Sequence, residues 1–462
     1  MTVVVGVDLG TSGLKLAALD PDGAVVAESE AGYPVERPQP GWAQTDVAVW
    51  RTALDDALGT LAGLLRDRPV AAVGLSGQMH GAVLVDAAGT ALAPAVLWPD
   101  RRAAGELDRW RRLAGPDRAA LANPLAAGMT GPLLAWLAVH QPRLLDRAAS
   151  VLLPKDALRA TLLPGTDPAV TDRSDASATL LWDVPADGWS AAATAAAGID
   201  PGLLPAVRRG DAVAGEAELL GGAVPVVVGG ADTPLALLAA GTREGVQVNL
   251  GSGAQVIRPG VPAAPAADPV VHCYADAEAG WYAMAALQNA GTAWSWVREV
   301  LGMDWPAFAG SLSASTPGAG GVVFAPFLTG ERGGVAAPGA RGGWTGLSAD
   351  TTRADLARAA VEGVACAVAA ALDLLDPAAG ELVVLTGGGA RDPAVQQVLA
   401  DALDRPVQHV QVRSASATGA AVLAARGVGL ELVPQRAAGA VVEPARRGGS
   451  AELRERWAAA VR

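Results

Sequence analysis

The chain has 462 residues, of which 51% are hydrophobic and 18% are charged, and its 35 basic and 47 acidic side chains give a net charge of −12. This length suits two large domains, and the apolar content is enough for a packed core, which excludes an intrinsically disordered chain. The acidic balance argues against a protein that binds nucleic acid or a membrane surface, because such proteins need a basic face. Small anionic ligands stay compatible with it, since backbone amides and a few placed cations can hold them.

Signals for disulfides, metal sites and targeting are few. The two cysteines, Cys273 and Cys366, exclude a disulfide framework and a multi-cysteine metal site, and the four histidines share no metal-ligand spacing. The first residues lack the basic segment and the cleavage site of a secretory signal. Charged residues interrupt the apolar stretches, residues 357–375 among them, so no membrane span is predicted. We therefore expect a cytoplasmic protein without membrane contact.

The basic residues are almost all arginines, and lysine occurs only at Lys15 and Lys155. A bias of this kind usually reflects the base composition of a genome. Against that background, the two lysines that remain are more noticeable than lysines in an ordinary sequence.

The first half of the chain predicts a meander followed by alternating helices and strands. Residues 3–10 form an apolar, β-branched run that ends in a glycine turn, and residues 14–20 and 24–30 predict two more strands around the tight turn at 20–23. The elements expected next are a helix over 46–65, buried strands over 70–76 and 82–86, several helices between 101 and 148, a strand over 224–228 and a helix over 234–240.

The second half repeats one pattern of the first. Val248-Asn249-Leu250-Gly251-Ser252-Gly253 echoes Val7-Asp8-Leu9-Gly10-Thr11-Ser12 in the same register. The further expected elements are a strand over 246–250, loops over 259–269 and 315–321, a helix over 355–375, a strand over 381–386 and a helix over 393–403. The repeat predicts two α/β domains of related build, which we divide into 1–243 and 244–462, with ligands bound where the turns cluster.

Four glycine turns at strand ends favour a nucleotide site. They are Gly10-Thr11-Ser12-Gly13, Gly229-Gly230-Ala231-Asp232, Gly251-Ser252-Gly253 and Gly387-Gly388-Gly389. Such turns expose backbone N–H groups and can cradle a phosphate. The chain has no Gly-x4-Gly-Lys-Ser/Thr motif, no convincing Gly-x-Gly-x-x-Gly after the first strand and no Gly-x-Ser-x-Gly elbow, which disfavours P-loop, dinucleotide-binding and serine-hydrolase functions.

Two carboxylates stand beside these turns. Asp8 follows a strand and precedes a phosphate-type turn, so it could hold Mg²⁺, or simply form the turn. Asp232 is either the N-cap of a helix or a general base for a sugar hydroxyl, and the two roles are compatible. His80 is a lone histidine between glycines, more typical of a turn than of a ligand site. Trp98 is a candidate face for stacking against a sugar.

Several motifs together resemble the FGGY family of carbohydrate kinases, and among them most the xylulokinase subgroup, for which Gln78-Met79-His80-Gly81 is typical. They stand in the family's order: Val7-Asp8-Leu9-Gly10-Thr11-Ser12-Gly13, Gln78-Met79-His80-Gly81, Lys155-Asp156, Ser174-Asp175-Ala176-Ser177, Gly330-Glu331-Arg332 and Gly387-Gly388-Gly389-Ala390. The resemblance implies two actin-like, ribonuclease-H-type domains around a central cleft. Sugar and the first phosphate turn would belong to the first domain, and most of the ATP site to the second.

The resemblance also implies roles for single residues. Asp232 would be the catalytic base and Asp8 the residue associated with Mg²⁺. The residues implied to bind the sugar are Gln78, Met79, His80, Trp98, Asp100 and Thr233. Those implied to bind ATP are Gly10, Thr11, Ser12, Lys15, Gly251, Ser252, Gly253, Gly291, Gly388 and Gly389. A homodimer is compatible with the resemblance, and no nucleic-acid partner is expected.

The implied activity is ATP-dependent phosphorylation of a ketose, in the first place D-xylulose to D-xylulose 5-phosphate. Two departures from the family pattern keep alternatives open: Thr233 stands where the family has Asn, and Pro99 replaces the Asn of Trp-Asn-Asp. Because a lost amide against a sugar hydroxyl can change discrimination strongly, another ketose or a sugar alcohol is a second possibility. A sensor that binds sugar or nucleotide without turnover is the third.

Overall fold

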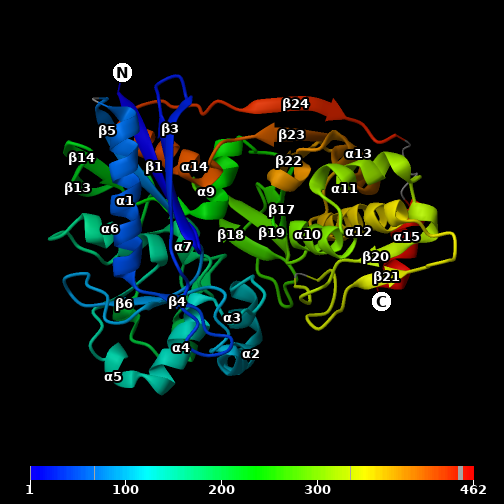
Figure 1. Ribbon diagram of the computed structural model, residues 1–462. Coiled ribbons are helices and arrows are strands. Elements are labelled where there is room, and N and C mark those ends of the chain that lie inside the picture. The colour runs from blue at the N-terminus through cyan, green and yellow to red at the C-terminus, as the bar shows by residue number, and fades with distance from the viewer. Residues whose placement is uncertain (1, 67, 333, 446–450, 462) are drawn as a thin grey trace.

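The computed structural model describes residues 2–66, 68–332, 334–445 and 451–461 and shows two α/β lobes, each built on a seven-stranded mixed sheet (Figure 1). The two sheets stand next to each other, and the helices cover their faces. Within the described residues, none of the helices has the length and apolar character that would carry it through a bilayer. The predicted α/β class with two lobes is confirmed.

The first lobe is formed by the first half of the chain. Its elements are β1 (Val3–Leu9), β2 (Gly13–Leu19), β3 (Val25–Gly32), β4 (Gln44–Thr45), α1 (Val47–Leu65), β5 (Val70–Gly77), β6 (Val83–Val85), β7 (Ala95–Val96), α2 (Leu107–Arg111), α3 (Gly115–Ala120), α4 (Thr130–His140), α5 (Pro142–Leu145), β8 (Ser150–Leu152), α6 (Pro154–Leu162), β9 (Val170–Asp172), α7 (Arg173–Ala176), β10 (Trp182–Asp183), β11 (Gly188–Trp189), α8 (Ala191–Ala197), β12 (Ala206–Arg208), β13 (Val213–Leu219), β14 (Gly222–Val227), β15 (Gly230–Ala231) and α9 (Asp232–Ala240).

The second half of the chain builds the second lobe on a sheet of its own and also supplies α14, which packs on the first sheet. Its elements are β16 (Val246–Leu250), β17 (Ala254–Pro259), β18 (His272–Ala275), β19 (Trp281–Leu287), α10 (Gly291–Val300), α11 (Trp305–Ala314), β20 (Val323–Ala325), β21 (Gly343–Thr345), α12 (Arg353–Asp373), β22 (Val383–Thr386), α13 (Pro393–Leu403), β23 (Val407–Gln411), α14 (Ala415–Gly427), β24 (Ala437–Val442) and α15 (Ala451–Ala460). The predicted helices and strands are found with ends that agree to within about two residues, the usual uncertainty of helix and strand ends. Residues 315–321, expected as a loop, contain one 3₁₀ turn over Ala319–Gly321.

The two sheets share one topology, which confirms the repeat seen in the sequence. In the first, β1 pairs antiparallel with β2 and parallel with β5, and β5 pairs parallel with β14. In the second, β16 pairs antiparallel with β17 and parallel with β22, and β22 pairs parallel with β23. The ends of β1, β5, β16 and β22 therefore carry the glycine turns and the motif residues, as expected for α/β sheets that bind ligands at strand ends.

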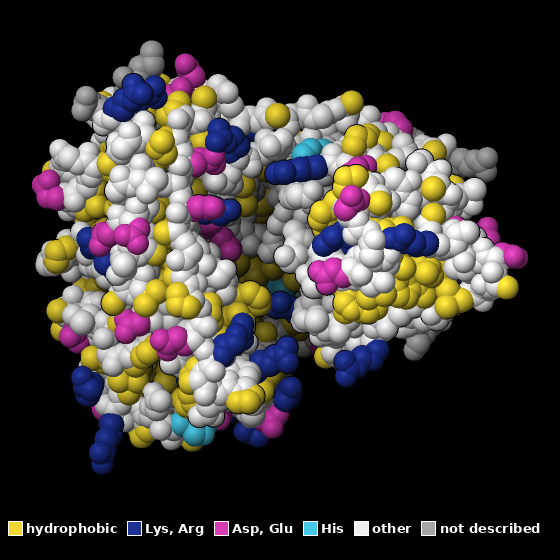
Figure 2. All heavy atoms as spheres, in the orientation of Figure 1, with side chains coloured by type: hydrophobic (Ala, Val, Ile, Leu, Met, Phe, Trp, Pro, Cys, Tyr) yellow, Lys and Arg dark blue, Asp and Glu magenta, His cyan; other side chains and the backbone are white. Residues whose placement is uncertain are grey.

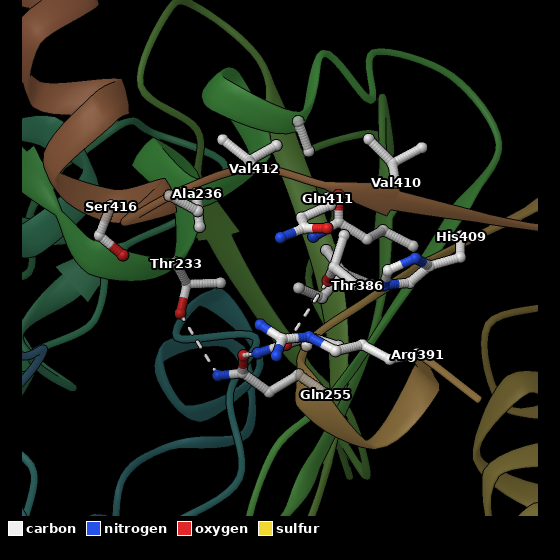
Figure 3. A pocket seen from close by; sticks show the side chains of 17 residues that line it. Thr233, Ala236, Gln255, Thr386, Arg391, His409, Val410, Gln411, Val412 and Ser416 are labelled. Atoms are coloured by element: carbon white, nitrogen blue, oxygen red, sulfur yellow. Dashed lines mark hydrogen bonds between the residues drawn. The ribbon is translucent and has the colours of Figure 1, made fainter. Parts of the chain in front are cut away.

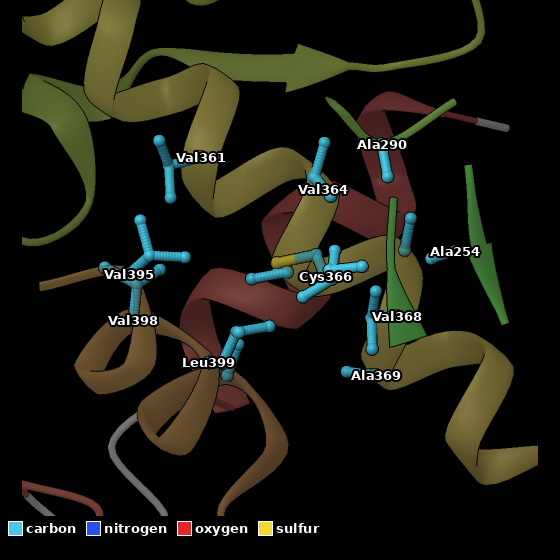
Figure 4. Close-up of a cluster of buried hydrophobic side chains, with 14 of the residues drawn as sticks. Ala254, Ala290, Val361, Val364, Cys366, Val368, Ala369, Val395, Val398 and Leu399 are labelled. Carbon is cyan, nitrogen blue, oxygen red and sulfur yellow. The ribbon is translucent and has the colours of Figure 1, made fainter. Parts of the chain in front are cut away.

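Each sheet has its own apolar core, and its central strands, β1 in the first sheet and β16 in the second, are buried along almost their whole length because both faces of the sheet are covered. In the second lobe, Val364 and Cys366 of α12 pack close to Val395 and Leu399 of α13, and Ala254 of β17 belongs to the same cluster (Figure 4). Helix α12 is started by Thr352 and Asp355, which form a reciprocal capping box. The two cysteines are free thiols, and burial raises the pKa of Cys366 to about 12.

Helix α14 comes late in the sequence but packs on the first sheet and on α9. Three glycines make this approach close enough. A Cβ atom at Gly6 would lie 1.7 Å from the carbonyl oxygen of Ala417, one at Gly74 would lie 2.1 Å from that of Ala420, and one at Gly419 would lie 2.0 Å from that of Leu235. Helices α9 and α14 pack against each other where the chain passes between the lobes. After α14 the chain returns to the second sheet as β24 (Figure 1).

Candidate active site

The short pairing of β15 with β5 brings the segment before Asp232 to the end of the first sheet. Gly230 lies opposite Ser76 and Ala231 lies opposite Gly77, so Asp232 and Gln78 follow neighbouring strand ends. Asp8 lies opposite Ser76 on the other side of β5, and the hydroxyl of Ser76 donates a hydrogen bond of 2.9 Å to the Asp8 carboxylate. Two carboxylates predicted from sequence are therefore brought together.

The electrostatics of this pair differ from those of ordinary surface carboxylates. Burial, followed by the negative charge of Asp8, raises the pKa of Asp232 to about 7. Burial also raises the pKa of Asp8, while Ser76 and Lys15 act in the opposite direction. Lys15 lies opposite Asp8 on β2, and its exposed ammonium stands 3.8 Å from Glu30. Asp232 is thus balanced between its charged and neutral forms near neutral pH, as suits a general base.

Gln78 and Met79 line the site beside Asp232. The Gln78 side chain is buried and donates a hydrogen bond of 3.1 Å to the carbonyl oxygen of Gly10, while its carbonyl oxygen Oε1 finds no partner among the described residues. An unpaired buried acceptor is costly unless a ligand or water completes it. Met79 is buried, and its sulfur lies 3.9 Å from the hydroxyl of Tyr282 in the second lobe. The sequence Gln78-Met79 thus contributes one open acceptor and one apolar wall.

His80 has one defined protonation state. Its Nδ1 lies 2.6 Å from the carbonyl oxygen of Ala178, so Nδ1 carries the proton and donates. Burial, together with the charge of Arg332, lowers the pKa of His80 to about 4, although the bond to Ala178 opposes the shift. The imidazole is therefore neutral at pH 7, and Nε2 is left as an acceptor. The backbone of His80 has a positive φ of 65°.

Trp98 and Asp100 form the next wall. The indole N–H of Trp98 donates a hydrogen bond of 2.9 Å to the hydroxyl of Thr11, which ties the tryptophan to the glycine turn that follows β1. Asp100 is buried, accepts from the amide of Ala43 at 2.6 Å and pairs with Arg102 at 2.8 Å. Its carboxylate is therefore engaged with the protein, and its observed effect is to hold the segment that carries Trp98.

The remaining glycine turns meet in the second lobe. The amide of Gly291 donates to the carbonyl oxygen of Gly251 at 3.0 Å, and the amide of Thr292 donates to that of Ser252 at 3.0 Å, so α10 begins on the turn 251–253. A Cβ atom at Gly253 would lie 2.3 Å from the oxygen of Leu287, and one at Gly387 would lie 2.4 Å from the oxygen of Leu250. Glycine is therefore required where these turns approach one another, and the predicted nucleotide residues of this lobe form one cluster.

A cavity of about 220 Å³ adjoins this cluster between α9, α14 and the strands of the second sheet (Figure 3). Thr233 of the first lobe and Gly388 of the second both line it. Within it, Gln255 donates to the hydroxyl of Thr233 at 3.4 Å (Figure 3). Outside the cavity lining, Thr233 donates to Asp232 from its amide at 2.6 Å and from its hydroxyl at 3.2 Å. The Thr233 side chain thus links the Asp232 carboxylate to the second sheet.

Figure 2 shows the surface hollowed between the two lobes, with charged side chains on the walls. The side chains of Asp8, Asp232, Gln78 and His80 come from the first lobe, and the turns at 251–253 and 387–389 come from the second. Models for the N-terminal and C-terminal domains of the FGGY family of carbohydrate kinases match residues 3–239 and 247–428. The chain belongs to this family.

Known FGGY kinases resemble the chain over almost its full length. The xylulose kinase of Escherichia coli (strain K12) is 33% identical over 445 residues, which cover 94% of this chain and 90% of that protein. The xylulose kinase of Streptomyces rubiginosus is 35% identical over 448 residues, or 92% and 87% of the two chains. A crystal structure of a xyloylose kinase from Brucella ovis superposes with a TM-score of 0.88 at 30% identity, covering 99% of this chain and 98% of that one. The predicted family and the predicted enzyme class, an ATP-dependent sugar kinase, are confirmed.

This FGGY kinase also places second-lobe residues in the site that sequence reasoning missed. Tyr274 lies edge-on to His80 with ring centroids 6.0 Å apart, and its hydroxyl lies 2.7 Å from Nδ1 of His272. The guanidinium of Arg332 lies 5.5 Å from the centre of the Trp98 ring. Only Arg332 had a sequence signal, because it belongs to the motif Gly330-Glu331-Arg332. The two other residues lie on β18, a strand without a motif.

The motif Gly330-Glu331-Arg332 of this FGGY kinase holds the segment that leads into α10. Buried Glu331 accepts from the amide of Gln288 at 2.7 Å, and Asn289 donates to the carbonyl oxygen of Gly330 at 2.7 Å. Residues 288–289 directly precede Gly291 at the start of α10. The glycine turns leave open space at Gly388, where a Cβ atom would meet nothing within 4 Å. ATP fits beside Gly388, which lines the cavity of about 220 Å³ and brings no side chain into it.

Proposed function

We propose that this kinase transfers the γ-phosphoryl group of ATP to a terminal hydroxyl of D-xylulose, giving ADP and D-xylulose 5-phosphate. The observation that carries the proposal is the position of Asp232, which lies beside Gln78 at the strand ends and close to Asp8 in the cleft. The relatives named xylulose kinase support the choice of sugar. The motifs and the geometry of the site support phosphoryl transfer from ATP, and the names of the relatives support D-xylulose as the acceptor.

Asp232 acts in this proposal as the base that orients the acceptor hydroxyl and takes its proton. A positioned acid or base of this kind typically contributes about 10²–10⁴-fold to the rate. Phosphoryl transfer passes through a loose, highly charged transition state, so positioning and charge neutralisation dominate its catalysis. The amide and the hydroxyl of Thr233 fix one oxygen of the Asp232 carboxylate, which leaves the other oxygen for the acceptor.

Asp8 is the residue proposed to hold Mg²⁺, directly or through water. The donor set fits a hard cation, because the carboxylates of Asp8 and Asp232 lie close enough for the charge of Asp8 to raise the pKa of Asp232, and Mg²⁺ binds through carboxylate oxygens. When bound, Mg²⁺ neutralises phosphate charge. Gly10, Thr11 and Ser12 would cradle the terminal phosphates from one side and Gly251, Ser252 and Gly253 from the other. Gly291, Gly388 and Gly389 would hold the adenosine.

The sugar side of the proposal uses the first lobe. Gln78 offers its unpaired Oε1, and neutral His80 offers Nε2, so two acceptors are available to sugar hydroxyls. Met79 and Trp98 provide the apolar walls. Asp100 supports Trp98 through its bonds to Ala43 and Arg102. Thr233 acts on Asp232 and takes the place of an amide that could contact the sugar.

We also propose a domain boundary near residues 243–244, between α9 and β16. The pairing within each sheet supports this division, with one exception. Helix α14 lies beyond the boundary in sequence but packs on the first sheet, so the chain crosses between the lobes at α9 and again around α14.

The test is a panel of pentuloses, hexuloses and sugar alcohols, assayed for sugar-dependent ADP release. The proposal predicts the highest kcat/KM with D-xylulose. A higher kcat/KM with another ketose or with a sugar alcohol would retain the kinase and replace the acceptor. No stimulation by any sugar, with nucleotide still bound, would favour a sensor without turnover.

A further inference from the structure

Lys155 is a buried lysine that the proposed chemistry does not use. It lies in α6, its side chain is 0% exposed, and its Nζ stands 2.6, 3.0 and 3.1 Å from oxygens of Asp156, Asp172 and Asp175. Taking charges out of water is costly, so removing one partner of a buried cluster leaves the other charges uncompensated and is strongly destabilising. The ammonium of Lys155 belongs to a residue that contacts Gly77, the neighbour of Gln78 in the proposed sugar site.

The chemistry of the cluster requires lysine in particular. An ammonium is a compact charge on which three carboxylates can converge, whereas a guanidinium is a planar fork. The neighbouring Arg159 shows the contrast. Its Nη1 reaches Asp156 at 2.6 Å and the carbonyl oxygen of Val228 at 2.8 Å, while its Nη2 reaches the carbonyl oxygen of Val170 at 2.5 Å. In a chain whose other basic residues are almost all arginines, only Lys15 and Lys155 are lysines. Lysine is kept at position 155 although arginine stands at almost every other basic position.

One connection leads from Lys155 to Asp232. Asp172, paired with Lys155, accepts hydrogen bonds from the amide and the hydroxyl of Ser174 at 2.7 and 2.5 Å. The oxygen of that hydroxyl accepts from the amide of Ala231 at 2.9 Å. Ala231 directly precedes Asp232, so the chain of contacts ends at the backbone of the proposed base.

A second connection leads to His80. Asp175, paired with Lys155, lies in the single turn α7, and its carbonyl oxygen accepts from the amide of Ala178 at 3.1 Å. The carbonyl oxygen of Ala178 in turn accepts the Nδ1 proton of His80. The position of α7 therefore sets the position and the tautomer of His80.

A third connection is steric. A Cβ atom at Gly77 would lie 2.8 Å from Cβ of Lys155 and 3.3 Å from its backbone nitrogen. Gly77 is the last residue of β5 and precedes Gln78. The stem of Lys155 thus contacts the third segment of the sugar site, and all three segments meet at one side chain.

We propose that Lys155 is a positioning residue that holds Gln78, His80 and Asp232 in register for the sugar. The inference rests on the proposed function, because it takes these three residues as the acceptor side of the reaction. Without the ammonium, the carboxylates of Asp156, Asp172 and Asp175 repel one another. Helix α7 then shifts against β5, and the two acceptors and the base lose their common geometry. The nucleotide turns of the second lobe make no contact with this cluster and keep their affinity.

The experiment compares Lys155→Met with Arg358→Met. Arg358 and Glu362 form a buried ion pair of 2.7 Å in α12 of the second lobe, so the control removes a cation of similar burial far from the sugar site. For each folded variant, sugar kcat and KM are measured with the best sugar of the panel, and the Kd for ADP is measured by titration. Lys155→Met is expected to lower kcat/KM about 100-fold, the loss typical of a misplaced reacting group, while Arg358→Met changes it less than about threefold. The Kd for ADP stays within about threefold in both variants.

The inference is overturned if folded Lys155→Met keeps kcat/KM within about threefold of the unsubstituted enzyme, or if both variants lose activity only in proportion to their unfolded fraction. Should Lys155→Met not fold, Ser174→Ala interrupts only the connection to Ala231. It is expected to lower kcat about tenfold with the sugar KM within about threefold, and an unchanged kcat would contradict the inference. The base itself is tested separately by Asp232→Asn, so a failed base assignment and a failed role of Lys155 give different results.

Discussion

Asn249 takes the place in the second sheet that Asp8 takes in the first. Asp8 lies opposite Lys15 on the antiparallel neighbour and opposite Ser76 on the parallel one. Asn249 lies opposite Gln255 and Thr386 in the same two directions. The duplicated fold therefore presents one carboxylate and one amide at equivalent strand ends, and only the carboxylate can carry a negative charge.

This asymmetry predicts the effect of a second carboxylate. Asn249→Asp is expected to raise the Kd for ADP about tenfold, because an added negative charge near the phosphates costs roughly 1–2 kcal/mol at an effective dielectric constant of about 20. Titration calorimetry with ADP measures the change. Asn249→Ala, which removes the amide without adding charge, serves as the control and should stay within about threefold. Equal losses in both variants would show that the amide itself, and not the charge, matters.

The raised pKa of Asp232 predicts the pH dependence of the reaction. Because the base acts only when deprotonated, kcat/KM for the sugar should fall about tenfold per pH unit below a pKa of about 7. A profile from pH 5 to pH 9 with a saturating concentration of ATP measures this limb. A profile that stays flat down to pH 5 would contradict the role of Asp232, since an ordinary aspartate titrates near 4.

The raised pKa of Asp232 also predicts that the protein loses stability over the pH range in which activity rises. The folded-state pKa of Asp232 lies above its unfolded value, so the folded chain binds more protons between pH 4 and pH 7 and loses stability as pH rises through that window. Asp232→Asn should therefore raise Tm at pH 8 by about 2 °C or more, with a smaller gain at pH 5. Calorimetric scans at both pH values measure the two Tm values. If Asp232→Asn melts at the same or a lower temperature than the unsubstituted enzyme at pH 8, the charged form of Asp232 does not destabilise the fold.

His80 offers a test on the sugar side alone. Its positive φ of 65° suits asparagine better than most residues, so His80→Asn keeps the backbone while it removes the ring and its Nε2 acceptor. We expect the KM for the sugar to rise at least about tenfold and the Kd for ADP to stay within about threefold. Steady-state kinetics and an ADP titration measure the two values. A sugar KM that does not change would remove His80 from the binding site.

The packing of α14 on the first sheet combines apolar side chains with a close backbone approach at Gly6. Gly6→Ala places a Cβ atom against the carbonyl oxygen of Ala417, and we expect the free energy of unfolding to fall by about 3 kcal/mol, the upper range for overpacking. Gly59→Ala in α1 is the matched control, since its Cβ would meet nothing within 4 Å, and it should gain about 0.5–1 kcal/mol. Urea unfolding compares the two. A loss no larger than about 0.5 kcal/mol for Gly6→Ala would contradict the close packing of α14.

The sequence predicts most of the two sheets, because apolar β-branched runs and glycine turns are local signals. The strand over 3–10 and the helix over 46–65 are found as β1 and α1. The place of α14 could not be predicted in this way. Its sequence, rich in alanine and glycine, has little amphipathic pattern, and its main partners in the sheet, β1 and β5, lie within residues 3–77.

Contacts between distant segments also limit what the sequence reveals of the site. Asp8, Gln78, His80 and Asp232 stand next to glycine turns, and the pairing of β15 with β5 brings them together. Tyr274 carries no motif, and it reaches His80 only because the two lobes meet there. Lys155 gives a compositional signal, but its role depends on contacts with α7 that no local pattern contains.

The measurement that tests the account most directly is sugar-dependent ADP release by Asp232→Asn, together with the Kd of the variant for ADP. Asparagine preserves the size of the side chain and removes its ability to take a proton. The account predicts a loss of at least about 10²-fold in kcat, with the Kd for ADP within about threefold of the unsubstituted enzyme. A variant that releases ADP at the full sugar-dependent rate would contradict it.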